Sequence, residues 1–174
     1  MIGALCRCLR CRRGSAITEF VLILPMMALL FAGTVEATRL LRLDRKLQNA
    51  AYATADLVTQ KPSIDNNRMS DVLLAADLVM EPFVVDGLGV GISSVVFDPT
   101  DGTPAVDWAE SHRGGTVPDA VIKADGMGPP GDSVVIVRAT YDYVPLFGEF
   151  VFGTIPLEEL AFARPRRSST VIRE

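Results

Sequence analysis

With 174 residues, the chain is long enough for one small domain with an attachment segment, and short for a large enzyme. Its net charge of −4 is unevenly distributed, because residues 1–14 hold four arginines and no acid, which leaves 13 basic and 21 acidic side chains in residues 15–174. The excess of acidic residues in 15–174 argues against binding to nucleic acid, because phosphate contacts need clustered Lys and Arg.

The basic leader, residues 1–14, also holds all three cysteines of the chain, Cys6, Cys8 and Cys11. No histidine or fourth cysteine stands nearby to complete a tetrahedral metal site, so we interpret the three as incidental thiols. Residues 15–174 contain no cysteine, and an exported domain made of them uses no disulfide.

An uncharged apolar segment, residues 20–35, follows the leader. As a helix it spans about 24 Å at 1.5 Å per residue, and the flanking residues extend it to the thickness of a bilayer. Glu19 and Glu36 lie just inside the two ends. We therefore predict a single transmembrane helix over residues 15–41. The basic leader favours a cytoplasmic N-terminus, which places residues 42–174 in the periplasm.

Three fates of this segment remain open. It stays as an uncleaved anchor, or signal peptidase cuts after the small-residue stretch VEA, residues 35–37, or a peptidase cuts on the cytoplasmic side after Gly14. The third fate accounts for Glu19. Ser15 then becomes the N-terminus, and its ammonium group lies four residues before the carboxylate. In a helical polymer the two groups of neighbouring subunits can pair, which offsets their cost in the membrane and fixes subunit register.

The stretch RRGSAITEF resembles a prepilin-peptidase site: Gly14 precedes the cut, Glu19 is the fifth mature residue, and an apolar helix follows. Over residues 13–60 the chain resembles the TadE-like family of pseudopilins from tight-adherence (Flp-type) pilus systems. The matching features are Glu19-Phe20, Pro25, Gly33, Glu36 and the Ala-rich continuation. The later stretches YDYVPLFG and FARPRRSSTVI also resemble parts of that family.

The resemblance implies processing between Gly14 and Ser15 by a membrane prepilin peptidase, a role of Glu19 in subunit register, and helix packing by Phe20 and Pro25. It implies other pseudopilins and pilus assembly components as partners, and no catalysis. Because major pilins of these systems are very short, we expect a minor pseudopilin of the inner membrane. The alternative is a signal-anchored periplasmic binding or enzymatic domain that enters no filament.

Beyond the membrane the helix is predicted to continue as an amphipathic segment that packs on its own domain and ends near Lys61, since Pro62 disfavours helix before it. Its apolar stripe has helical spacing and consists of Leu40, Leu43, Leu47, Ala50, Ala51, Leu57 and Val58, with Thr54 as its polar member. A second helix is predicted from an N-cap at Ser70 to Pro82. Its apolar face consists of Val72, Leu73, Ala76, Val79 and Met80.

The second half of the chain has the alternation of β-strands. Strands are predicted at LGVGISSVVF, residues 88–97, and within DSVVIVRATYDYV, residues 132–144, where Val135 through Tyr143 share a face at every second position. LEELAFARP gives a further short strand or a helical turn. The predicted fold class is α+β: a long N-terminal helix, first transmembrane and then amphipathic, packed on a small antiparallel sheet as in pilins.

Candidates for chemistry are few. His112 lies near Asp107 and Glu110, but DWAESHRGG reads as an exposed loop. Asp98, Asp101 and Asp107 offer oxygen ligands to calcium, without the spacing of a known calcium loop, and are interpreted as turn residues. Trp108 is expected in the core, and RPRR, residues 164–167, as a solvated run of charge. We therefore expect no catalytic residue, no metal and no cofactor.

Overall fold

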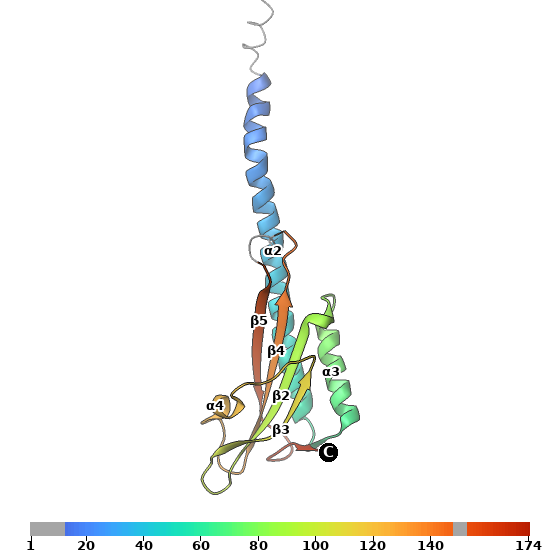
Figure 1. Cartoon of the computed structure of the whole chain (residues 1–174), viewed down its shortest axis with the longest axis vertical. Helices are drawn as coiled ribbons and strands as arrows, with labels where there is room; N and C mark the ends of the chain where they lie inside the picture. Colours follow the sequence, from blue (N-terminus) through green and yellow to red (C-terminus); the bar gives the residue numbers. More distant parts are fainter. Residues whose placement is uncertain (1–12, 148–152) are drawn as a thin grey trace, which may run out of the picture.

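The computed structural model describes residues 13–147 and 153–174, so the expectations about Cys6, Cys8 and Cys11 lie outside the described residues. Helix α2, Arg13–Thr59, is unbroken over 47 residues, which corresponds to a length of about 70 Å. Figure 1 shows its N-terminal half extending alone from the domain and its C-terminal half lying along the sheet. The predicted long helix is confirmed, and it ends two residues before Lys61.

The N-terminal half of α2 is apolar and exposed. It is the one helix within the described residues that is long and apolar enough to cross a membrane, and the side chains of its apolar window are not buried by the rest of the chain. Pro25 lies inside α2 without ending it, as membrane helices tolerate. The segment predicted to span the bilayer is thus a continuous helix with an apolar surface.

The C-terminal half of α2 forms the spine of the core. Leu43, Leu47, Ala50 and Val58 of the predicted stripe are each at most 1% exposed. The polar member, Thr54, is equally buried, and its hydroxyl donates to the Ala50 carbonyl at 2.7 Å. This bond satisfies the hydroxyl within the helix, which explains how a threonine fits an apolar stripe.

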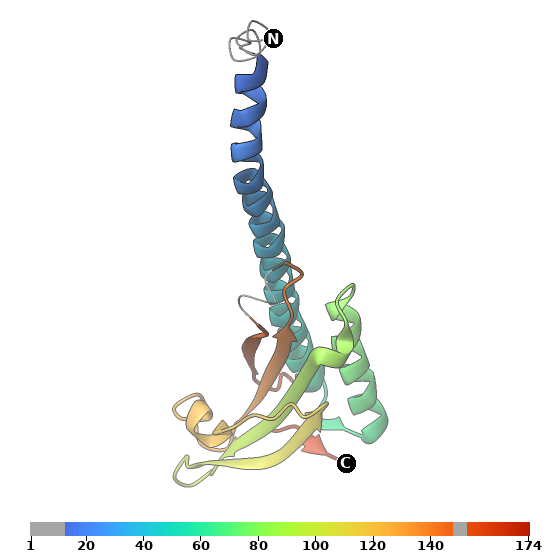
Figure 2. The ribbon, with the colours of Figure 1, turned by 45° about the horizontal axis from the view of Figure 1, so that its top comes forward.

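Helix α3, Asn66–Met80, packs beside α2 (Figures 1 and 2). The predicted start at Ser70 is wrong. Asp65 is the N-cap, and its carboxylate accepts a hydrogen bond from the Arg68 backbone N–H at 2.7 Å. Ser70 lies inside the helix, where its hydroxyl donates to the Asn66 carbonyl. The predicted apolar face is confirmed, with Val72, Leu73, Ala76, Val79 and Met80 buried or half-buried against the core.

Four antiparallel strands form the main sheet in the order β3-β2-β4-β5. They are β2 Leu88–Phe97, β3 Pro104–His112, β4 Ser133–Tyr143 and β5 Ile155–Ala163. The strands expected at 88–97 and 132–144 are confirmed, and LEELAFARP is a strand rather than a helical turn. The exposed loop expected at DWAESHRGG is wrong up to His112, because residues 107–112 belong to β3, which pairs with β2.

Smaller elements complete the domain. The two-residue strands β1, Ser63–Ile64, and β6, Ile172–Arg173, pair in parallel. The 3-10 helix η1, Val85–Gly87, leads into β2, and the short helix α4, Ala120–Ala124, lies on the side of the sheet away from α2. The predicted α+β class is confirmed: a long helix packs on a small antiparallel sheet.

Candidate functional site

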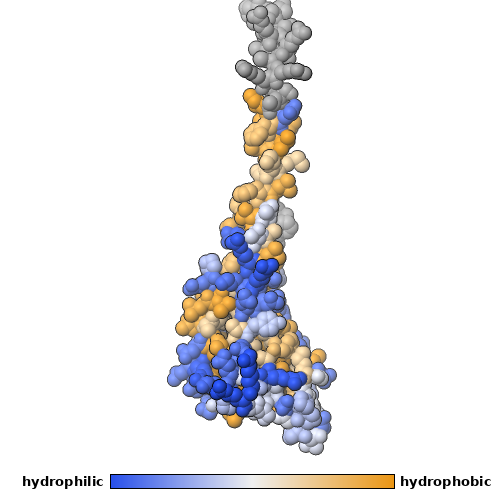
Figure 3. Space-filling view, turned by 180° about the vertical axis from the view of Figure 1, so that it is seen from behind, coloured by the Kyte–Doolittle hydropathy of each residue, from blue (hydrophilic) through white to orange (hydrophobic). Residues whose placement is uncertain are grey.

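The projecting half of α2, residues 13–38, is called the rod below. Figure 3 shows its coloured part as mostly hydrophobic and the surface of the domain as largely hydrophilic. The residues predicted to act in cleavage, subunit register and helix packing all lie on α2. Gly14 and Ser15 belong to the first turns of α2, and Glu19, Phe20 and Pro25 follow on the same helix. Phe20 is 58% exposed, and Glu19 is exposed as well. The exposed apolar surface of this helix can therefore contact bilayer lipid or neighbouring helices.

Helix geometry relates the two predicted charge positions. Residues four apart lie on one face of an α-helix, one turn from each other. Ser15 and Glu19 are four apart within α2, so the helix holds both positions on one side of the rod.

Glu36 joins the rod to the domain. Its carboxylate accepts a hydrogen bond from the Tyr143 hydroxyl, and further bonds from the backbone N–H groups of Leu146 at 3.1 Å and Phe147 at 3.3 Å. The segment that follows β4 is thereby fixed to α2. The sequence placed Glu36 inside one end of the span but not against these partners. The one signal for them was the resemblance of YDYVPLFG, which contains all three partners, to the same family.

Tyr143 stays a hydrogen-bond donor at any physiological pH. Its side chain is buried at the end of β4. Burial and the hydrogen bond to Glu36 raise the pKa of the Tyr143 hydroxyl to about 12. The link between helix and domain therefore does not depend on titration of the phenol.

The structure does not bring His112, Asp107 and Glu110 together into one site. His112 is half-buried, with its Nε2 atom 3.8 Å from Asp77, and Arg113 binds the same Asp77 carboxylate through two nitrogens. Glu110 instead pairs with Arg173 at 3.0 Å, and Asp107 is exposed. The three side chains thus face different surroundings.

The calcium candidates also have separate roles. Asp98 accepts from the Thr100 N–H at 2.7 Å, and Asp101 accepts from the Thr103 N–H at 2.9 Å, as aspartates in tight turns do. That bond also lowers the pKa of Asp101. Within residues 13–147 and 153–174, no three His, Cys, Asp or Glu side chains gather closely enough to hold a metal ion.

Two further expectations concern packing. Trp108 is half-buried against the core, and its Nε1–H donates to the Val171 carbonyl at 2.7 Å, which anchors the C-terminal segment. The arginines of the basic run 164–167 are exposed, as expected, and two of them also bind the domain: Arg166 pairs with Asp56 of α2 and Arg164 donates to the Met127 carbonyl. Both arginines contribute to docking of the C-terminal segment.

Comparison with known proteins gives one family. Residues 14–56 match the family described as TadE-like protein. This confirms the resemblance found in the sequence over about a quarter of the chain, a stretch that lies wholly within α2. No curated protein and no solved structure matches the chain.

Proposed function

We propose that the chain is a minor pseudopilin of the TadE-like kind, which acts in the assembly of a tight-adherence (Flp-type) pilus. The observation that carries this proposal is the family match at residues 14–56. It covers both the exposed apolar half of α2 and most of the half packed in the domain. The apolar half of such a subunit can lie in the bilayer before assembly and pack against the helices of other subunits in the pilus afterwards. The domain then stays outside the helix bundle.

In this proposal the protein is a single-pass protein of the inner membrane with a cytoplasmic leader and a periplasmic domain. Its work is mechanical, and it acts on other pseudopilins and assembly components rather than on a substrate. Phe20 and the apolar residues around it form the packing surface. Pro25 lacks an N–H group, which weakens the helix locally and lets it adapt to its neighbours.

Prepilin peptidase is proposed to cut between Gly14 and Ser15. The new ammonium group of Ser15 then pairs with Glu19 of an adjacent subunit. Two charges that are each costly in an apolar bundle offset one another there, and the pair accepts one register between subunits in preference to others.

Mass and N-terminal sequence of the membrane-bound protein from its native host test the processing step. We expect a chain that begins at Ser15. A chain that begins at Thr38 is a secreted domain, and an intact leader is a plain anchor; either result contradicts the proposal.

Gly14→Ala is the matching variant, and we expect it to retain the leader, because a side chain at this position obstructs the peptidase. The retained leader adds the mass of residues 1–14 to the membrane-bound form. Normal removal of the leader in this variant would refute the assigned cut.

Glu19→Ala is expected to insert into the membrane normally but to enter the pilus at least about tenfold less, because removal of one partner of a buried charge pair costs roughly 3–5 kcal/mol. The readout is the ratio of the protein in sheared pili to that in the membrane fraction.

Thr34→Ala provides the control for Glu19→Ala. It removes a hydroxyl on the same rod that bonds only the Leu30 carbonyl of its own helix in the described structure. We expect this variant to assemble as the wild type does. Equal assembly of Glu19→Ala and Thr34→Ala would defeat the charge-pairing proposal.

A further inference from the structure

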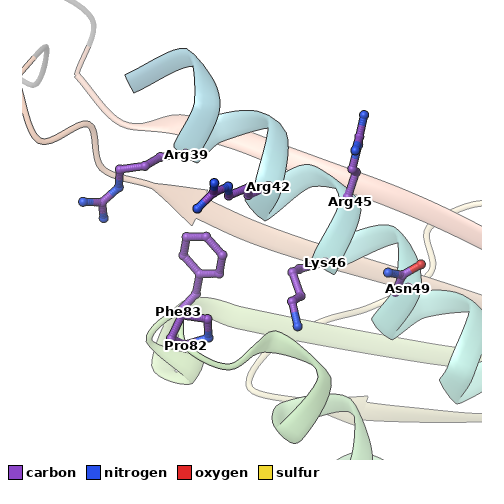
Figure 4. A pocket seen from close by; sticks show the side chains of 7 residues that line it. All are labelled: Arg39, Arg42, Arg45, Lys46, Asn49, Pro82 and Phe83. Atoms are coloured by element: carbon purple, nitrogen blue, oxygen red, sulfur yellow. The ribbon is translucent and has the colours of Figure 1, made fainter. Parts of the chain in front are cut away.

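A basic cleft lies where the rod enters the domain. It has a volume of about 500 Å³ and lies between α2 and the turn after α3. Its lining consists of Arg39, Arg42, Arg45, Lys46, Asn49, Pro82 and Phe83. Figure 4 shows Arg42 and Lys46 directed towards the Pro82–Phe83 turn, while Arg45 points away from it.

The lining of the cleft is strongly positive. Four of its seven lining residues are cations and none is an acid. None of these four cations forms a salt bridge with any residue that the structure describes. Arg39 lies close to Glu36 and to the Tyr143 hydroxyl, so Arg42, Arg45 and Lys46 are the cations that face an outside anion. Asp44, the acid nearest to them along the helix, is half-buried and lies near Glu159. The cleft therefore favours an anion from outside the chain.

The position of the cleft along α2 matches a membrane surface. The rise from Arg39 to Lys46 is about 10 Å, which spans the headgroup layer of about 5–8 Å on one side of a bilayer and extends slightly beyond it. The uncharged apolar segment of α2 ends at residue 35, and Glu36 and Arg39 are the first charged residues after it. The cations therefore reach headgroup level when that segment is in the hydrocarbon core.

Exposed apolar side chains lie near one end of the cleft, close to Glu36 and Arg39. Glu36 holds the backbone of Leu146 and Phe147, whose side chains are 56% and 63% exposed. Val84 and Val144 are also exposed, and they line a second hollow that shares Arg39 and Phe83 with the cleft. Cations beside exposed apolar side chains are the pattern of proteins that rest on a membrane interface.

We propose that this cleft binds the phosphate-bearing headgroup of an anionic phospholipid, with Arg42 and Lys46 on the phosphate and the apolar side chains near Leu146 and Phe147 in the acyl boundary. Continuity with the apolar half of α2 favours lipid over an acidic protein, because the exposed apolar tips beside the cleft have no role against an acidic surface. The proposal needs the apolar half of α2 to lie in a bilayer, in either orientation, and does not depend on a role in a pilus.

The test is native mass spectrometry of the full chain in neutral detergent, titrated with phosphatidylglycerol or phosphatidylcholine. We expect the wild type to retain phosphatidylglycerol in preference. The double variant R42Q/K46Q should bind phosphatidylglycerol about 10- to 30-fold more weakly, from about 1 kcal/mol for each cation near an anionic lipid. Retention of phosphatidylcholine should be the same in both proteins.

The matched control is K61Q/R68Q, which removes two exposed cations at the opposite end of the domain. It should retain phosphatidylglycerol as the wild type does, and circular dichroism should show all three proteins folded before lipid is added. Unchanged phosphatidylglycerol binding in R42Q/K46Q would overturn the proposal. The proposal would also be overturned if inorganic phosphate displaced phosphatidylglycerol equally well from the wild type and from R42Q/K46Q. It would be overturned too if R42Q/K46Q lost a co-purifying acidic protein while its lipid binding stayed unchanged.

Discussion

Two adjacent glutamates on β5 have opposite environments. Glu158 accepts a hydrogen bond from Arg138 at 2.6 Å, which lowers the pKa of its carboxyl. Glu159 lies on the other face of the strand, half-buried towards α2, where burial and the nearby Asp44 raise the pKa of its carboxyl. The folded protein thus favours the charged form of the first and the neutral form of the second.

Glu159→Gln is expected to increase stability at pH 7. Its raised pKa in the folded state means that ionisation destabilises the fold, and this penalty grows as the pH rises from the unfolded pKa through the folded one. Below that window Glu159 is already neutral, so the gain should vanish. Thermal unfolding of the full chain in detergent, followed from pH 4 to pH 8, measures it.

Glu158→Gln serves as the matched control with the opposite sign. Its lowered pKa gives a stabilisation that is present above the unfolded pKa and lost as the pH falls through the folded one. We expect a small loss of stability at pH 7, since this carboxylate is largely exposed. Equal shifts of the same sign in the two variants would contradict these assignments.

The start of α3 depends on one cap. Asp65→Ala is expected to destabilise the protein by about 1 kcal/mol, because the Arg68 N–H loses its acceptor in the first turn. Ser70→Ala should change stability by no more than about 0.5 kcal/mol, since its hydroxyl only bonds a carbonyl of its own helix. Chemical denaturation compares the two, and a larger cost for Ser70→Ala would restore the cap predicted from the sequence.

The elements were predictable where a periodic apolar pattern is present. The helical spacing from Leu43 to Val58 predicts a helix, and the alternation of apolar residues in β4 predicts a strand. Strand β3 was missed because its outer position in the sheet leaves it with polar residues such as Glu110 and Ser111, and only pairing with β2 reveals it. The cap was misplaced because Asp65 and Ser70 both suit the role locally.

The helix that carries Gly14, Ser15 and Glu19 was predictable from the sequence, whereas the roles of these residues stay predictions. The junction between helix and domain was not predictable. The bonds of Glu36 to Tyr143 and Leu146 join residues more than a hundred positions apart, and no local pattern encodes such contacts. The basic cleft is likewise assembled from two distant segments, α2 and the turn at Phe83.

At the scale of the molecule, Glu36 couples rod and domain. Glu36→Ala is expected to lower stability by about 1–3 kcal/mol, because three donors lose a charged acceptor. Hydrogen exchange at the amides of Leu146 and Phe147 should become faster. Tyr143→Phe should weaken the fold less and leave those two amides protected. Unchanged exchange in Glu36→Ala would show that the segment is held by other contacts.

The unbroken course of α2 sets the direction in which the domain faces. No flexible linker separates the apolar half from the buried half, so rotation of one turns the other. Each residue of an α-helix adds about 100° of rotation, so one residue inserted after Glu36 would swing the cleft to another side of the rod. Seven inserted residues restore the azimuth to within about 20° but lift the domain by about 10 Å. The number of residues between the two halves of α2 therefore determines the direction in which the domain faces around the helix axis.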